Sequence, residues 1–208
     1  MRMYLIRHGE SVWNAQDRIQ GHGDSPLSPR GLEQAMALGR RLREASIRAV
    51  YSSPLLRARQ TAEAIRETLR APLVLRSELR EIHLGDWEGK TPDEVNARFD
   101  NGYDVWRTRP TAAVIPNAEP IEAFRQRAIN AIEAVARTAD AETVAIVTHG
   151  GVICAYLAHL LDADFDLLLR RLQINNSGVT IIEALEHEHP AILAVNDLRH
   201  LHNHHAAD

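Results

Sequence analysis

The sequence lacks the features that mark several protein classes. One of its 208 residues is cysteine, Cys154, which excludes an internal disulfide framework and a cysteine-based zinc ribbon. No apolar run approaches the roughly 18–20 residues that a helix needs to cross a bilayer. The first residues turn charged within a few positions, so they lack the apolar core of a signal peptide. We therefore expect a protein of the cytoplasm with no membrane contact.

Positive charge is not in excess, and lysine is nearly missing. The chain carries 24 Lys and Arg against 28 Asp and Glu, a formal net charge of −4. This balance argues against a protein that binds nucleic acid or acidic membranes. Lys90 is the only lysine. Codon bias explains this most simply, although arginine is also the better clamp for oxyanions.

The rest of the composition is that of an ordinary folded chain. Hydrophobic residues make up 45% and charged residues 25%, which excludes disorder of the whole chain. No repeat and no low-complexity linker divides the sequence, and the length suffices for one core. We expect a single domain over residues 1–208. Residues 90–120 or so would form a lid-like insertion, and about 200–208 a histidine-rich tail.

Short apolar runs alternate with helical patterns along the chain. The runs that predict strands are residues 3–6, 49–51, 72–75, 143–147, 179–184 and 192–195. Helical patterns cover about 29–45, 54–70, 92–99, 120–138, 151–161 and 164–172. This alternation predicts an α/β fold, a three-layer α/β/α sandwich with a mostly parallel sheet. In such sheets, ligands bind at the carboxyl ends of the strands.

The sequence predicts three N-cap residues at helix starts. Ser28 and Ser53 each precede a proline, which predicts a capping hydroxyl followed by proline at the first helical position. Thr91 has Glu94 three residues later, the pattern of a capping box.

Three predicted strands lead into loops that carry histidine or arginine. Arg7 and His8 follow the first strand, Arg57 lies in the first turn of the helix after the second, and His149 precedes Gly150 after a later one. Arginine together with backbone N–H groups at a helix start binds phosphate, and neutral imidazole is a nucleophile near pH 7. Alone, each histidine is more often a packing residue and each arginine a surface ion pair. Their joint position favours an anion pocket with a histidine able to attack phosphorus.

These blocks resemble a known family. Residues 5–10 read Leu-Ile-Arg-His-Gly-Glu, residues 52–62 read Ser-Ser-Pro-Leu-Leu-Arg-Ala-Arg-Gln-Thr-Ala, and residues 148–151 read Thr-His-Gly-Gly. Together and in this order they resemble the phosphatase branch of the histidine phosphatase superfamily, whose fold is called phosphoglycerate mutase-like. The resemblance runs from residue 3 to about residue 200.

The resemblance implies a role for each matching residue. His8 would be the catalytic nucleophile that is transiently phosphorylated, and Glu81 the proton donor. The side chains that would complete the catalytic phosphate pocket are Arg7, Arg57 and His149. Asn14, Gln20 and Gly150 match positions that bind substrate or phosphate. The sequence by itself does not choose Glu81 over Glu78, Asp86 or Glu88.

Other matches are weaker. Glu10 matches a position at the mouth of the site, and His200 matches a histidine that the family often carries near its C-terminus. The tail histidines could bind a transition metal, although adventitious affinity is the simpler interpretation. Where the family often has Gly-Glu-Ser, this chain has Ala-Glu-Pro, so that Glu119 matches while the glycine and the serine of that turn are absent. Arg107 and Arg109 are expected to be solvated and to flank an anchoring Trp106.

The resemblance implies a phosphatase for small phosphomonoesters with no metal and no organic cofactor, because arginine and imidazolium counter the phosphoryl charge. One alternative is a phosphoglycerate mutase. Only 68 positions separate Glu81 from His149, too few for the insertion of the family's mutases. An alternative of another class is a non-catalytic module that binds a phosphorylated ligand or a metal. Leu84 stands where phosphoserine-type members have histidine, which disfavours phosphoserine. Dimers are common for such folds, so a homodimer is the expectation that the resemblance implies.

Overall fold

The computed structural model describes residues 1–184 and 190–201. Its sheet has six strands in the order β3-β2-β4-β1-β5-β6. The strands are β1 (Arg2–Arg7), β2 (Ala49–Ser52), β3 (Leu73–Leu75), β4 (Thr143–Thr148), β5 (Val179–Glu183) and β6 (Ala191–Asp197). Strands β1 to β4 are parallel to one another, and β5 pairs antiparallel with both β1 and β6. The predicted mostly parallel sheet is confirmed, and each predicted strand is present.

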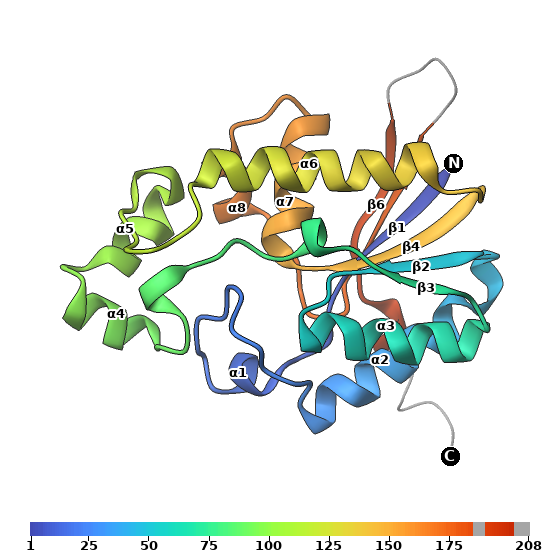
Figure 1. The fold of residues 1–208 in the computed structure, drawn as a ribbon, viewed down its shortest axis with the longest axis horizontal. Helices are drawn as coiled ribbons and strands as arrows, with labels where there is room; N and C mark the ends of the chain where they lie inside the picture. Colours follow the sequence, from blue (N-terminus) through green and yellow to red (C-terminus); the bar gives the residue numbers. More distant parts are fainter. Residues whose placement is uncertain (185–189, 202–208) are drawn as a thin grey trace.

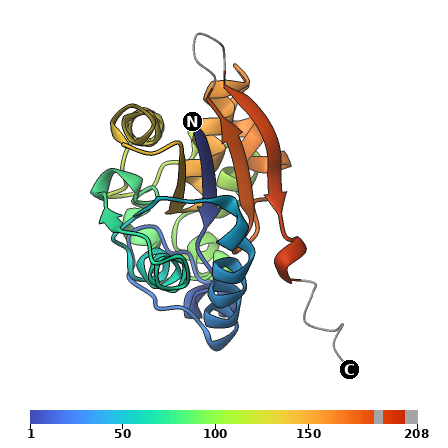
Figure 2. The same ribbon diagram turned by 90° about the vertical axis from the view of Figure 1, so that its right-hand side faces the viewer.

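Helices cover both faces of this sheet (Figure 1). One face carries α2 (Pro29–Arg41) and α3 (Leu56–Leu69), and the other carries α6 (Ile121–Thr138), α7 (Gly150–Leu160) and α8 (Phe165–Arg171). In Figure 2, α3 and α6 are seen end-on on opposite sides of the strands. The three-layer sandwich is therefore confirmed.

The core lies in two layers on either side of the sheet. Consecutive side chains of a strand point to opposite faces, so Leu5 packs with α6 and α7 while Ile6 packs with α2 and α3. Both are fully buried. Because both faces are covered, the central strands read as continuous apolar runs, which is why the sequence located them.

The strand register brings the predicted site residues to one edge. Arg7 at the end of β1 is level with Thr148 at the end of β4, and Ser52 at the end of β2 is level with Val147. The chain therefore leaves these three strands at the same place, with His8, His149 and Ser53 as the next residues.

The remaining helices are short. Helix α1 (Val12–Ala15) follows β1, and the segment 92–108 forms α4 (Pro92–Arg98) and α5 (Gly102–Thr108), which lie together at one end of the molecule (Figure 1). The sequence did not predict α1 or α5. The 3-10 turns are η1 (Leu42–Ala45), η2 (Ser77–Leu79), η3 (Gly85–Trp87), η4 (Pro110–Ala112) and η5 (Arg199–Leu201).

Two of the three predicted caps are confirmed. Ser28 accepts the Gly31 N–H at the start of α2, and Thr91 forms a complete capping box with Glu94 at the start of α4. The prediction for Ser53 is wrong: α3 begins at Leu56 with Leu55 as its N-cap and no side-chain cap. The Ser53 N–H instead donates to Val147 O at 3.0 Å, which holds Ser53 against the sheet.

No helix within the described residues is long and apolar enough to cross a membrane. The histidine-rich tail lies outside the described residues from position 202 onward.

Candidate active site

A cavity of about 440 Å³ lies at the carboxyl edge of the sheet. Its lining includes seven of the predicted site residues: Arg7, His8, Asn14, Gln20, Arg57, Glu81 and Gly150. His149 is fully buried beside His8, their rings edge to face with centroids 5.2 Å apart. The fold thus gathers all eight predicted residues, although they are spread from β1 to α7.

The two ring nitrogens of His8 have different partners: one contacts a backbone carbonyl, and the other contacts a side chain that lines the cavity. Its Nδ1 lies 2.7 Å from the carbonyl oxygen of Gly9. A carbonyl oxygen only accepts, so Nδ1 carries the proton and Nε2 carries the lone pair. The Arg57 Nε–H donates to this Nε2 at 3.2 Å. The unprotonated nitrogen of this imidazole is therefore placed against a guanidinium that can bind an anion.

Arg57 is held by the loop that follows α1. Its Nη1 and Nη2 donate to the carbonyl oxygens of Gly23 and Gly21, both at 2.8 Å. Gly21 adopts a φ of +52°, a conformation that other residues rarely adopt, and it presents its carbonyl to the guanidinium. Burial lowers the pKa of Arg57 to about 10, which still leaves it charged at neutral pH.

Arg7 supplies a second, partly buried cation. It donates through Nη1 to the carbonyl oxygen of Ile174, and burial lowers its pKa although the charge of Glu81 opposes this. Within the described residues, its Nε is buried with no hydrogen-bond partner. An unpaired buried N–H is costly, and a bound anion would satisfy it.

The hydroxyl of Ser53 contacts one ring nitrogen of His149. Ser53 Oγ lies 2.9 Å from His149 Nε2 and accepts the Leu55 N–H at 3.3 Å. The tautomer in which the Ser53 hydroxyl donates to Nε2 carries the imidazole proton on Nδ1. Within the described residues, that Nδ1 is buried with no partner. It is a second donor that an anion beside His8 would satisfy.

Both histidines are neutral in this environment. Burial lowers the pKa of His8 and of His149 well below 6.5, and the charges of Arg57 and Arg7 lower both further. His8 therefore keeps its lone pair at neutral pH, as a nucleophile must.

Glu81 is held at the start of α7. Its Oε1 accepts the Ile82 N–H and its Oε2 accepts the Gly151 N–H, both at 3.0 Å. A Cβ at Gly151 would lie 2.3 Å from Glu81 Oε1, so only glycine leaves room for the carboxylate there. Of the four carboxylates that the sequence left open, Glu81 lines the cavity. Glu78 is exposed, Asp86 accepts from Asn117, and Glu88 accepts the His22 and Leu84 N–H groups.

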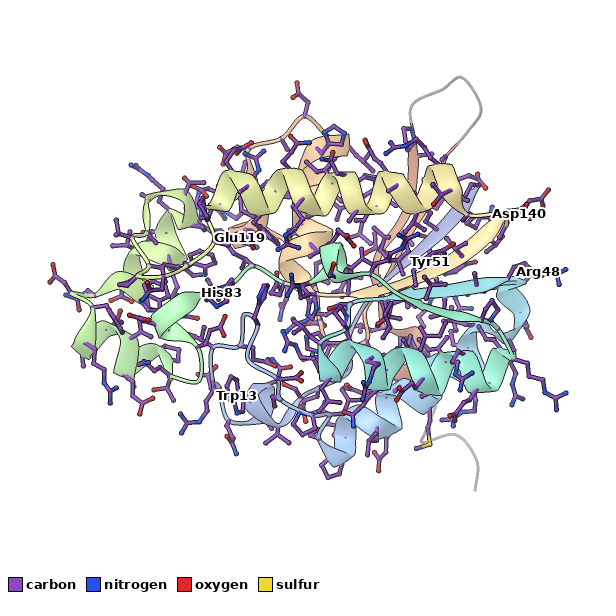
Figure 3. All side chains as sticks on the ribbon, viewed as in Figure 1. Trp13, Arg48, Tyr51, His83, Glu119 and Asp140 are labelled. Atoms are coloured by element: carbon purple, nitrogen blue, oxygen red, sulfur yellow. The ribbon has the colours of Figure 1, made fainter. Side chains whose placement is uncertain are left out.

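The backbone that carries Glu81 is also fixed. His22 Nε2 lies 2.8 Å from the Glu81 carbonyl oxygen. Arg127 donates to the carbonyl oxygens of Glu78, Arg80 and Glu81 and pairs with Glu119 at 2.7 Å. His83 and Glu119, labelled in Figure 3, lie close together because the His83 N–H donates to Glu119 Oε2. Arg127 and Glu119 therefore keep this segment at the cavity.

Asn14 and Gln20 are anchored by their oxygens. Asn14 Oδ1 accepts the Ser11 N–H at 3.2 Å and the Asn176 amide at 3.1 Å, which leaves the Asn14 Nδ2 group to offer to an anion. Gln20 Oε1 accepts the Ser11 hydroxyl at 2.7 Å.

Two weaker expectations are wrong. Glu10 does not line the cavity, because its carboxylate accepts the Ser28 hydroxyl at 2.7 Å and faces the start of α2. His200 lies in η5, which packs against α2, and is not among the cavity-lining residues. Arg107 and Arg109 are exposed as expected, and Trp106 packs against Trp87. Asn117 takes a φ of +59° in the turn before Glu119, a conformation that asparagine adopts more readily than most residues.

Sequence reasoning missed the residues that support the site. Ser53 was read as a cap, and Arg127 and Asn176 were not singled out. Their signals were weak, since each acts through residues distant in the sequence: Asn176 donates to the His8 carbonyl oxygen across 168 positions. Within the described residues, no group of three or more His, Cys, Asp or Glu could hold a metal ion.

Comparison with known proteins agrees with this geometry. The family model of the histidine phosphatase superfamily (branch 1) matches residues 3–198. The chain is 35% identical to the adenosylcobalamin/alpha-ribazole phosphatase of Salmonella typhimurium, over 77% of this chain and 80% of the relative. It is 31% identical to the "Probable phosphoglycerate mutase GpmB" of Erwinia tasmaniensis, over 88% and 85%.

Among solved structures, Bacillus stearothermophilus YhfR superposes with a TM-score of 0.90 at 37% identity, covering 96% of this chain and 98% of the other. The family model spans nearly the whole chain and includes every residue of the cavity described above. The chain belongs to the histidine phosphatase superfamily (branch 1).

Proposed function

We propose that this protein hydrolyses small phosphomonoesters through a phosphohistidine formed on His8. The observation that carries the proposal is the arrangement of His8 against the buried Arg57 and near the charge of Arg7, with Nδ1 bonded to Gly9 O and the lone pair on Nε2. An imidazole held this way can attack an anionic phosphoryl group that the arginines bind.

In the first half-reaction, a phosphoryl oxygen takes over the Arg57 Nε–H and frees the His8 Nε2 lone pair. Nε2 attacks phosphorus, the bond from phosphorus to the ester oxygen breaks, and the protonated Glu81 carboxyl gives its proton to the departing alcohol. Arg7, Arg57, Asn14 and His149 Nδ1–H bind the phosphoryl oxygens, as does the N-terminus of α7 at Gly150.

In the second half-reaction, the Glu81 carboxylate takes a proton from a water molecule. The water oxygen attacks phosphorus, the bond from phosphorus to Nε2 breaks, and inorganic phosphate leaves. His8 is again neutral and Glu81 is again protonated. The charge on the transferred group is countered throughout by arginine, imidazole and backbone N–H groups.

The test is phosphate release from p-nitrophenyl phosphate, phosphoserine, 3-phosphoglycerate and sugar phosphates, with chelator present. Wild type and His8→Ala are compared, and His159→Ala, an exposed histidine on α7, is the matched control. We expect turnover by wild type and the control, and a loss of at least about 1000-fold in His8→Ala.

Equal turnover by wild type and His8→Ala, or a requirement for added metal, would contradict the proposal. The likeness to GpmB makes interconversion of 3- and 2-phosphoglycerate the alternative outcome, which the same assay with product analysis detects. The homodimer and the cytoplasmic location stay predictions.

A further inference from the structure

We propose that the preferred substrates are phosphomonoesters whose alcohol part carries a flat, uncharged aromatic group, rather than small phosphates that carry a carboxylate. The inference rests on the proposed function, because it takes the end of the cavity at His8 as the place of the phosphoryl group. It concerns the other end of the same cavity, where the alcohol part of the ester would lie.

Aromatic side chains are prominent in the lining of this cavity. The chain has only ten Phe, Trp and Tyr residues, 5% of its composition. Five of them line this one cavity: Trp87, Tyr103, Trp106, Phe124 and Phe165. They come from η3, α5, α6 and α8, so that no single helix face or strand accounts for the cluster.

Two of these rings are packed against each other. The ring centroids of Trp87 and Trp106 are 6.3 Å apart at an interplanar angle of 78°, a geometry that aromatic pairs prefer. The start of α8 is tied to the end of the 92–112 segment, because Asp166 accepts the N–H and the hydroxyl of Thr111 at 3.0 and 2.6 Å. Trp87, Phe124 and Phe165 are buried, whereas Tyr103 and Trp106 are partly exposed, so a flat ring that enters the cavity would contact these two side chains first.

Aliphatic side chains also line the cavity. Leu84, Leu169, Leu172 and Ile174 are among them, and Gln173 adds an uncharged polar side chain. Leu84 stands next to η3, and the two other leucines come from α8 and the residue after it. An apolar group placed here would leave water, which is worth about 25 cal/mol for each Å² of apolar surface removed from it.

Few cationic side chains at this end could pair with a carboxylate of the substrate. Within the described residues, the lining beyond Arg7, Arg57 and Glu81 has one formally charged side chain, Arg18. Arg18 donates to the carbonyl oxygen of Gly89 at 2.6 Å and lies 3.5 Å from Glu94, so its charge is already engaged. A carboxylate buried here would lose water and would have to compete for that arginine.

The test compares three esters of primary alcohols, so that the leaving groups belong to one chemical class: 2-phenylethyl phosphate, glycerol 1-phosphate and O-phosphoserine. We expect kcat/KM for 2-phenylethyl phosphate to exceed the other two values by at least about tenfold, the effect of burying one phenyl ring.

Variants then locate the preference. Trp106→Ala should raise KM for 2-phenylethyl phosphate by about tenfold more than it raises KM for glycerol 1-phosphate. Val105→Ala, an exposed neighbour on the same helix, is the matched control and should match wild type with both esters. Thermal unfolding of each variant separates a folding defect from a loss of binding.

Three results would overturn the proposal. Equal kcat/KM for the three esters would do so, as would a preference for O-phosphoserine that Arg18→Gln removes. A loss in Trp106→Ala that is the same for every ester would also contradict it. Each of these leaves the proposed function standing, because phosphate is still released. No release from any ester would instead contradict the proposed function, and this inference with it.

Discussion

The two ends of the active-site cavity are built in different ways. At the end near His8, the side chains leave strand ends and helix starts, are buried, and are fixed by hydrogen bonds such as those of Arg57 to Gly21 and Gly23. At the other end, Trp106 and Phe165 come from two short helices, α5 and α8, and are held by ring packing and by the contact of Thr111 with Asp166.

This difference implies that the end near His8 determines the rate of the chemical step, whereas the end near Trp106 determines which ester is preferred. Attack on phosphorus requires donors and nucleophile to be placed within fractions of an ångström, which paired strands provide. The alcohol part of an ester requires only a surface of matching polarity. Changes near His8 should therefore alter the turnover of every ester alike, whereas changes near Trp106 should alter which ester is preferred.

Among the variants that test this comparison, Glu81→Gln is expected to have the largest effect on turnover. An amide cannot donate a proton to the departing alcohol or take one from water, so kcat should fall by about 100- to 10,000-fold for all esters. Steady-state kinetics with alkyl phosphates checks this, with Glu78→Gln as the matched control nearby. A fall in Glu81→Gln that differs between apolar and polar esters would break the separation of the two ends.

A smaller effect is expected from Ser53→Ala. Without the Ser53 hydroxyl, His149 is no longer held with its proton on Nδ1, and kcat should fall by about 10- to 100-fold for every ester, a typical cost of losing a supporting hydrogen bond. The tautomer can be read directly from the ¹⁵N chemical shifts of His149. Ser53→Thr should restore both the tautomer and most of the turnover. An unchanged ¹⁵N spectrum in Ser53→Ala would contradict this role.

The buried histidines should also make stability depend on pH. Burial lowers the pKa of His8 and His149, so below pH 6.5 the unfolded chain binds more protons than the folded one. The free energy of unfolding should therefore fall on acidification, by at most about 1.4 kcal/mol per pH unit for each histidine. Denaturant unfolding in phosphate-free buffer measures this slope. His8→Asn should reduce it, whereas Trp106→Ala should keep the slope of wild type.

The smallest effect is expected at the cap of α4. Thr91→Ala removes the capping hydroxyl and should lower the free energy of unfolding by about 1 kcal/mol. Because α4 packs with α5, which carries Trp106, this loss of stability should affect the part of the cavity near Trp106. Phosphate release from glycerol 1-phosphate should stay at the wild-type level. A marked fall with this ester would show that the two ends are not independent.

The sheet could be predicted from the sequence because its strands are buried on both faces and read as apolar runs, as β1 and β4 do. Helix α5 could not, since it has seven residues and begins after Asn101 at a φ of +56° with no side-chain cap. The Ser-Pro pair at Ser53 led to a wrong prediction of a helix cap. The Ser53 N–H donates to Val147 of β4, and no local sequence pattern contains a contact between residues so far apart.

The motif residues of the site could be predicted from the sequence, whereas the residues that hold them in position could not. The blocks around His8, Arg57 and His149 are local in sequence, and the parallel sheet brings them together. The choice of Glu81 among four carboxylates depends on the Gly151 N–H, 70 positions away, and no local pattern contains that contact. The aromatic end is likewise assembled from separate segments, so neither its members nor its polarity could be read from a motif.

The most direct test of the central claim is the identification of a phosphorylated residue during turnover. Wild type and Glu81→Gln are mixed with p-nitrophenyl phosphate, quenched in alkali, in which phosphohistidine survives, and mapped by mass spectrometry. We predict one phosphoryl group on His8, more abundant in Glu81→Gln because the second half-reaction lacks its base. Phosphate release with no phosphorylation of His8, or phosphorylation of a different residue, would contradict the account.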